Sequence, residues 1–181
     1  MIVVIGSVTA HTEGLIYRVG GYATTVALAL AAAGEPVELV SKVGVDPAGE
    51  AVIAKLAAGG IGHVALIRDA ARATAGDEAN ALQMDAADVQ LALRYLTSFD
   101  AVLLVDPTDD SVASTVLDAC AYVGARLVMT RPEGSRPAVV PAGERGEAPP
   151  PLDVERPGGD PAAVTDLLVA LLLPDRESPA A

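Results

Sequence analysis

The sequence predicts an α/β layer fold in which a mostly parallel sheet is covered by helices on both faces. Short runs of consecutive apolar residues, such as residues 2–5 and 101–105, are typical of strands that are buried on both faces. Along the chain these runs alternate with segments whose apolar residues recur at helical spacing, as at residues 112–123. Alternation of this kind indicates parallel strands joined by crossover helices.

In the first half of the chain, glycine and proline mark where each element starts and stops. An Ala- and Leu-rich helix is expected to follow Gly20-Gly21 and to end at Gly34, and Asp46-Pro47 supplies an N-cap and a first-turn proline for the next helix. The expected elements are, in order, a strand at 2–5, a short strand at 15–19, a helix at 22–33, a strand at 37–43, a helix from 47 to 58, a strand at 63–67 and a loop at 68–80.

The second half continues the same alternation. Asp85 is expected to cap a helix, and residues 132–156 are rich in Pro, Gly and Glu, which favours a loop. The expected elements are a helix after Asp85, a strand at 101–105, a helix with an apolar face at 112–123, a strand at 126–129, at most one short strand near 138–140, and a helix at 162–173. No internal repeat or second core is evident, so we expect one domain over residues 1–173 and a flexible tail at 174–181.

Composition excludes several classes of function. The 181 residues include 12 Lys and Arg against 24 Asp and Glu, a net charge of −12, and only one Phe, four Tyr and no Trp. Such a chain is a poor match for nucleic acid or an anionic membrane, so we expect neither as a partner. A single cysteine, Cys120, lies on an apolar helical face and is expected to be buried filler. With no basic leader and no apolar stretch of roughly 20 residues, the sequence predicts a cytoplasmic protein.

Ligands of parallel α/β sheets bind at the carboxyl ends of the strands. Gly20-Gly21 and Gly158-Gly159 each precede a helix, where backbone amides can hold an anion and glycine allows close approach. Each pair alone is also an ordinary turn. The first strand lacks a following Gly-x-Gly-x-x-Gly, so a dinucleotide-binding domain is set aside.

Taken in order, the motifs are more specific. Gly6-Ser7 closes the first strand, Gly20-Gly21 opens the Ala-rich helix, and Gly44 to Gly49 forms a Gly-x-Asp-x-x-Gly turn. Near the other end come a strand followed by Thr130 and Gly134, then Gly158-Gly159-Asp160. This order resembles the ribokinase (PfkB) family of carbohydrate kinases, over residues 1–173 with gaps.

The resemblance implies a three-layer α/β/α ribokinase-like fold with a reduced lid, formed by segments of about residues 8–21 and 68–82. It also implies a reaction, because members transfer the γ-phosphoryl group of ATP, with Mg²⁺, to a hydroxyl of a sugar or nucleoside. Asp160 would take the hydroxyl proton, and the amides of Gly158 and Gly159 would stabilise the moving charge. The other implied positions are Gly20, Gly21, Thr25 and His11 for the substrate and Thr130 and Gly134 beside the nucleotide, with no metal ligand assigned.

The alternative is a catalytically inactive relative that keeps the scaffold to bind a ligand or a protein. The family's substrate-binding Asp falls at His11 or Thr9, its Asn falls at Thr25, and Pro132 removes an amide donor beside the nucleotide. The chain is also shorter than typical members, so a homodimer is expected to cover exposed edges. On this alternative Asp160 only caps the last helix and His11 is only solvated.

Overall fold

The computed structural model describes residues 1–96, 98–107, 109–135, 150–156 and 161–173, the first three of the last range by backbone alone. Its main sheet has six strands in the order β5-β4-β1-β6-β7-β8, and every neighbouring pair is parallel. The strands are β1 (Ile2–Ile5), β4 (Val37–Gly44), β5 (Leu66–Asp69), β6 (Ala101–Val105), β7 (Arg126–Arg131) and β8 (Leu152–Glu155). The predicted parallel α/β sheet is confirmed.

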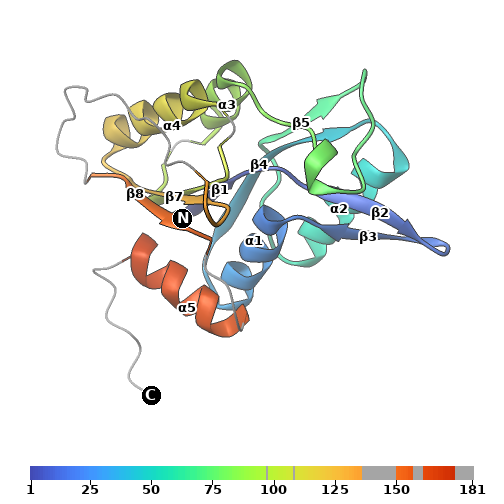
Figure 1. Ribbon diagram of the computed structural model, residues 1–181, viewed down its shortest axis with the longest axis horizontal. Helices are drawn as coiled ribbons and strands as arrows, with labels where there is room; N and C mark the ends of the chain where they lie inside the picture. Colours follow the sequence, from blue (N-terminus) through green and yellow to red (C-terminus); the bar gives the residue numbers. More distant parts are fainter. Residues whose placement is uncertain (97, 108, 136–149, 157–160, 174–181) are drawn as a thin grey trace.

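Helices cover the sheet on both faces, as Figure 1 shows. One layer holds α1 (Tyr22–Ala32), α2 (Pro47–Ala58) and α5 (Pro161–Leu172), and the other holds α3 (Ala86–Leu93) and α4 (Asp110–Val123). Strand β1 serves both layers, because alternate side chains of a strand point to opposite faces. Ile2 and Val4 join the cluster under the first layer, and Val3 and Ile5 join the second.

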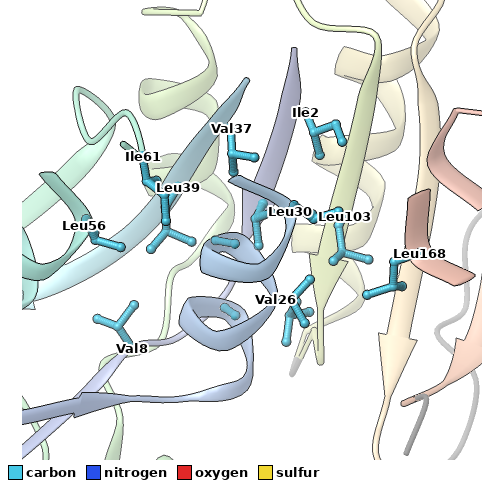
Figure 2. Packing of buried hydrophobic residues seen from close by; sticks show 14 of the residues in the cluster. Ile2, Val8, Val26, Leu30, Val37, Leu39, Leu56, Ile61, Leu103 and Leu168 are labelled. Carbon is cyan, nitrogen blue, oxygen red and sulfur yellow. The ribbon is translucent and has the colours of Figure 1, made fainter. Parts of the chain in front are cut away.

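The core is built almost entirely from aliphatic side chains. Leu30 of α1, Leu39 of β4 and Leu103 of β6 are fully buried and lie together with Leu168 of α5 in one cluster (Figure 2). Phe99 is the one buried aromatic ring among the described residues, and it belongs to the other cluster. Burial of these side chains supplies the main stabilisation, roughly 1.5–3 kcal/mol for each large one.

A separate antiparallel hairpin follows β1 and lies in the predicted lid segment. It consists of β2 (Thr9–Glu13) and β3 (Ile16–Gly20), and it contacts α2. The sequence predicted β3 but missed β2, because the polar residues of β2 show no apolar alternation. Leu15 and Ile16 at its tip are exposed.

Two strands differ from their predictions. Strand β5 begins three residues later than expected, because His63 to Leu66 forms a turn closed by a backbone hydrogen bond. Strand β8 lies inside the segment expected to be a loop; it is a half-buried edge strand, which lacks the apolar run of a central strand. The strand expected near 138–140 and the tail at 174–181 fall outside the described residues.

The described helices are all too short or too polar to cross a membrane.

Candidate functional site

A pocket of about 240 Å³ lies at the carboxyl edge of the sheet. Ser7 follows β1, Asp106 follows β6, Pro132 follows β7 and Arg156 follows β8, and all four line this pocket. The rule that parallel sheets bind ligands at this edge predicted the place.

Gly6 allows the first helix to pack closely beside this pocket. A Cβ at Gly6 would lie 2.8 Å from the Cβ atoms of both Ala23 on α1 and Val105 on β6. Gly21, the N-cap of α1, has φ +94°, and its Cβ would lie 3.0 Å from the carbonyl oxygen of Ser7. Both glycines therefore bring the start of α1 against the end of β1.

Arg156 is the centre of the charged groups in the pocket. Its guanidinium pairs with the carboxylate of Asp106, and its Nη1 lies 3.3 Å from Oε2 of Glu78. The guanidinium carbon also lies 4.7 Å from the centre of the Tyr22 ring, a cation–π distance. Four elements thus meet through one side chain: β8, β6, α1 and the 3₁₀ turn Glu78–Asn80.

Asp106 has an unusual backbone. Its φ of +46° makes it the sole non-glycine residue in the described ranges with a positive φ. Such a conformation costs roughly 1–3 kcal/mol for most residues and less for Asp, and residues of this kind cluster at functional sites. The amide of Asp106 donates to the carbonyl of Thr130 at 2.8 Å, which fixes the strained residue to β7.

Several polar atoms around the pocket have no hydrogen-bond partner among the described residues. They are Tyr22 Oη, Arg156 Nε and Asp106 Oδ1, all buried. Burial raises the pKa of Tyr22 above its ordinary value, although the nearby Arg156 acts in the opposite direction. Buried polar atoms in folded proteins are nearly always paired, so these atoms lack a partner that water, a ligand or a small side-chain shift would supply.

Glu78 occupies the amino end of α1. Its Oε1 accepts a hydrogen bond from the backbone amide of Tyr22 at 2.8 Å, and its other oxygen faces Arg156. On the neighbouring side, Ser7 Oγ donates to Gln83 Oε1 at 3.1 Å. The chain's own carboxylate therefore fills the place where the glycine pair Gly20-Gly21 was expected to leave room for an anion.

The predicted substrate residues Thr25 and His11 do not line this pocket. Thr25 is exposed, and its hydroxyl donates to the carbonyl of Gly21 at 3.1 Å. His11 is exposed on β2, opposite Arg18 in the hairpin. Of the predicted substrate positions, Gly21 lies directly before the lining residue Tyr22, and a Cβ built on it would lie 3.0 Å from the carbonyl oxygen of the lining residue Ser7.

The predicted nucleotide-side residues lie at the end of β7. Thr130 is fully buried, and its hydroxyl has no hydrogen-bond partner in the part of the chain that the structure describes; Gly134 is exposed in a turn with φ +72°. Between them Arg131 is held by Asp153 at 3.1 Å and Glu155 at 3.0 Å, which ties β7 to β8.

The predicted base and anion hole, Asp160 with Gly158 and Gly159, lie outside the described residues. Arg156 is the last described residue before them, and it lines the pocket.

The Gly-x-Asp-x-x-Gly turn has a structural role. Asp46 caps α2 through the amide of Gly49 at 2.8 Å and also accepts from the amide and hydroxyl of Thr74, each at 2.9 Å. The Thr74 hydroxyl in turn accepts from the amide of Gly44 at 2.9 Å. Burial alone would raise the pKa of Asp46, but these hydrogen bonds outweigh it and hold the pKa below its ordinary value. The motif therefore fixes the loop around residue 74 to β4 and α2.

The sequence missed the charged residues that define the pocket: Glu78, Asp106 and Arg156. Asp106 could have been found, because it directly follows the apolar run of β6 at the edge where ligands bind. Arg156 could not, because it follows a strand that the sequence did not reveal.

A larger and more apolar groove of about 430 Å³ lies between α3 and α4. Leu93, Phe99 and Tyr122 line it, together with Arg94 and Asp118. It shares no described lining residue with the carboxyl-edge pocket, since it is lined by the two helices and the loop before β6.

Comparisons with known proteins agree with the motifs. The family model for the pfkB family carbohydrate kinases matches residues 3–81, so the resemblance to this family is confirmed, in a shortened and divergent form. No protein of curated function matches the sequence.

Solved structures show the same fold. A PfkB protein from Polaromonas sp. JS666 has 21 % identity and a TM-score of 0.56, covering 71 % of this chain and 54 % of that one. A sugar kinase from Pyrococcus horikoshii in complex with ATP has 17 % identity and a TM-score of 0.57, covering 75 % and 54 %. A fructokinase with bound ATP from Xylella fastidiosa has 18 % identity and a TM-score of 0.57, covering 79 % and 55 %. The chain spans about half the length of these proteins, and its fold is that of pfkB-type sugar kinases.

Proposed function

We propose that the carboxyl-edge pocket binds a small carbohydrate-type molecule and that the protein transfers a phosphoryl group from ATP to one of its hydroxyls. The observation that carries the proposal is that Tyr22, Asp106 and Arg156 line one pocket and each has a buried polar atom without a hydrogen-bond partner among the described residues. Hydroxyl groups can both donate to the carboxylate and accept from the phenol and guanidinium.

The size of the pocket favours a sugar over a nucleoside. Its volume of about 240 Å³ is below the roughly 300–1,000 Å³ of most small-molecule sites. A monosaccharide is smaller than a nucleoside built on the same sugar, so it suits this volume better.

In the proposed reaction, the resemblance gives Asp160 the role of base. Its carboxylate would accept the proton of the attacking hydroxyl while the oxygen of that hydroxyl bonds to the γ-phosphorus and ADP leaves. The amides of Gly158 and Gly159 would donate to the transferring group. This assignment is supported by the chain order, since the three residues come directly after Pro157 and the pocket residue Arg156.

Mg²⁺ enters the proposal with ATP. The described residues hold no group of three or more His, Cys, Asp or Glu that could bind a metal ion, and the two carboxylates of the pocket already pair with Arg156. Magnesium is commonly held by substrate phosphates with one or two carboxylates, so such a cage is not required. When bound, the ion would neutralise charge on the phosphates.

The test is transfer of label from γ-labelled ATP to a panel of monosaccharides and nucleosides in the presence of Mg²⁺. We expect a labelled sugar product from the wild-type chain, and loss of at least about a hundredfold in rate for Asp160→Asn. Asp166→Asn is the matched control, because Asp166 is an exposed aspartate on α5. Equal rates for both variants would overturn the assignment of Asp160.

The second candidate is a binding protein without catalysis. It is favoured by the placement of Thr25 and His11, which lie on exposed surfaces away from the pocket. On this candidate the same sugar raises the melting temperature while no label is transferred. Whether the protein is a kinase or only a binding protein, we expect it to work in the cytoplasm, because Cys120 is a free, buried thiol.

A further inference from the structure

The charges of the carboxyl-edge pocket do not balance. Among its described lining residues, Arg156 is the one cation, while Asp106 and Glu78 are both carboxylates. The set therefore carries a net charge of −1 at neutral pH. Arg131, at the end of β7, is paired with Asp153 and Glu155 and adds no positive charge to the described part of the pocket.

Among the described residues, two places in this pocket attract an anion, and the chain's own carboxylates already occupy both. The first is the amino end of α1, where the amide of Tyr22 donates to Glu78 at 2.8 Å. The second is the guanidinium of Arg156, which pairs with Asp106 and, at 3.3 and 3.4 Å, with Glu78. An incoming carboxylate or phosphate would either displace a carboxylate from one of these places or approach the unpartnered Nε of Arg156, where it would lie beside Asp106 and Glu78.

We propose that this pocket selects a neutral polyhydroxyl molecule and rejects the corresponding sugar acid or sugar phosphate. The inference rests on the proposed function, since it takes the same pocket as the substrate site. Hydroxyl protons can be donated to Asp106, whereas a second anion beside Asp106 and Glu78 meets like charge in a partly dry site. The net charge of −12 on the whole chain acts in the same direction at longer range.

The opposite view is that Arg156 is a receptor for an anionic ligand. It requires the anion either to break an ion pair of Arg156, which would leave Asp106, whose side chain is 16 % exposed, without its cation, or to lie beside both carboxylates. Breaking a largely buried pair is costly, so the closed cluster favours the neutral ligand.

The inference is tested by calorimetric titration of the full chain with two matched pairs of ligands. One pair is D-glucose and D-glucuronate, and the other is D-ribose and D-ribose 5-phosphate. We expect a neutral member to bind and its charged partner to bind at least about tenfold more weakly. Equal or tighter binding of the charged partner would overturn the inference and leave a carbohydrate site in place. If no member of either pair binds, the proposed function fails, and the inference fails with it.

A variant that changes only the charge of the pocket tests whether that charge sets the preference for a neutral ligand. Glu78→Gln keeps an oxygen that can accept from the amide of Tyr22 but removes one negative charge from the pocket. We expect the ratio of the two dissociation constants, charged ligand over neutral ligand, to fall at least about threefold in this variant. Glu50→Gln is the matched control. Glu50 of α2 pairs with Arg68 of β5, and neither residue lines the pocket. The same fall in both variants would show that overall charge, and not the pocket, sets the preference.

Discussion

The ion pair between Arg156 and Asp106 is expected to stabilise the folded chain as well as shape the pocket. Their side chains are 29 % and 16 % exposed, which places the pair between a surface and a buried salt bridge. Exposed pairs contribute about 0–1 kcal/mol, whereas removing one partner of a buried pair costs about 3–5 kcal/mol. For Arg156→Met we therefore expect a loss of about 2 kcal/mol, since Met keeps apolar contact with the Tyr22 ring and the cost comes from the uncompensated carboxylate.

A double-mutant cycle separates the pair from the other contacts of each residue. Asp106→Asn keeps a residue type that tolerates the positive φ of this position. Because the double variant leaves no unpaired charge between the two positions, we expect it to be more stable than the sum of the single losses, with a coupling of about 1–2 kcal/mol.

The assay is urea denaturation at pH 7, followed by circular dichroism, with free energies of unfolding from linear extrapolation. Arg68→Met is the matched control, because Arg68 pairs with Glu50, a side chain that is 64 % exposed, and should cost under about 1 kcal/mol. A coupling below about 0.3 kcal/mol, or an equal loss in the control, would refute the account of the cluster.

Three further predictions concern the parts that hold the site in place. Gly6→Ala should cost about 1–3 kcal/mol in urea denaturation, because its Cβ would lie 2.8 Å from two core Cβ atoms; no loss would show that α1 can move away. Asp46→Asn keeps an acceptor for the Gly49 amide but loses the charge and the second acceptor oxygen, and because the folded-state pKa of Asp46 is lowered, the wild-type advantage, about 1 kcal/mol at pH 7, should shrink as the pH falls below about 4; an advantage that is undiminished at pH 2 would contradict this. Burial raises the pKa of Cys120 to about 12, so Ellman's reagent should label it only at the rate of unfolding, and prompt labelling of the native chain would place it elsewhere.

The regular elements of the fold could be predicted because each has a local cause. The strand β6 is a continuous apolar run, and α2 begins at a capping Asp46 followed by Pro47, as the structure confirms. The strands β2 and β8 could not be found in this way. Their residues are polar or half-buried, and they are held by pairing with a partner strand rather than by their own pattern.

The site was predictable in place but not in composition. Parallel topology alone directs attention to the carboxyl edge, where the pocket lies. Its charged cluster depends on Glu78, Asp106 and Arg156, which are distant in sequence and meet only because β6, β8 and the turn before α3 converge. The spacing of these residues along the sequence does not indicate that their side chains lie together.

The central claim is that the ligand binds at this edge of the sheet and not in the larger groove between α3 and α4. The most direct measurement is a set of ¹H–¹⁵N NMR spectra of the full chain, recorded during titration with the neutral monosaccharide that binds best. We predict that the amide signals of Ser7, Gln83, Asp106 and Arg156 shift with ligand. Shifts confined to Leu93, Phe99 and Tyr122 would place the ligand in the groove and contradict the account.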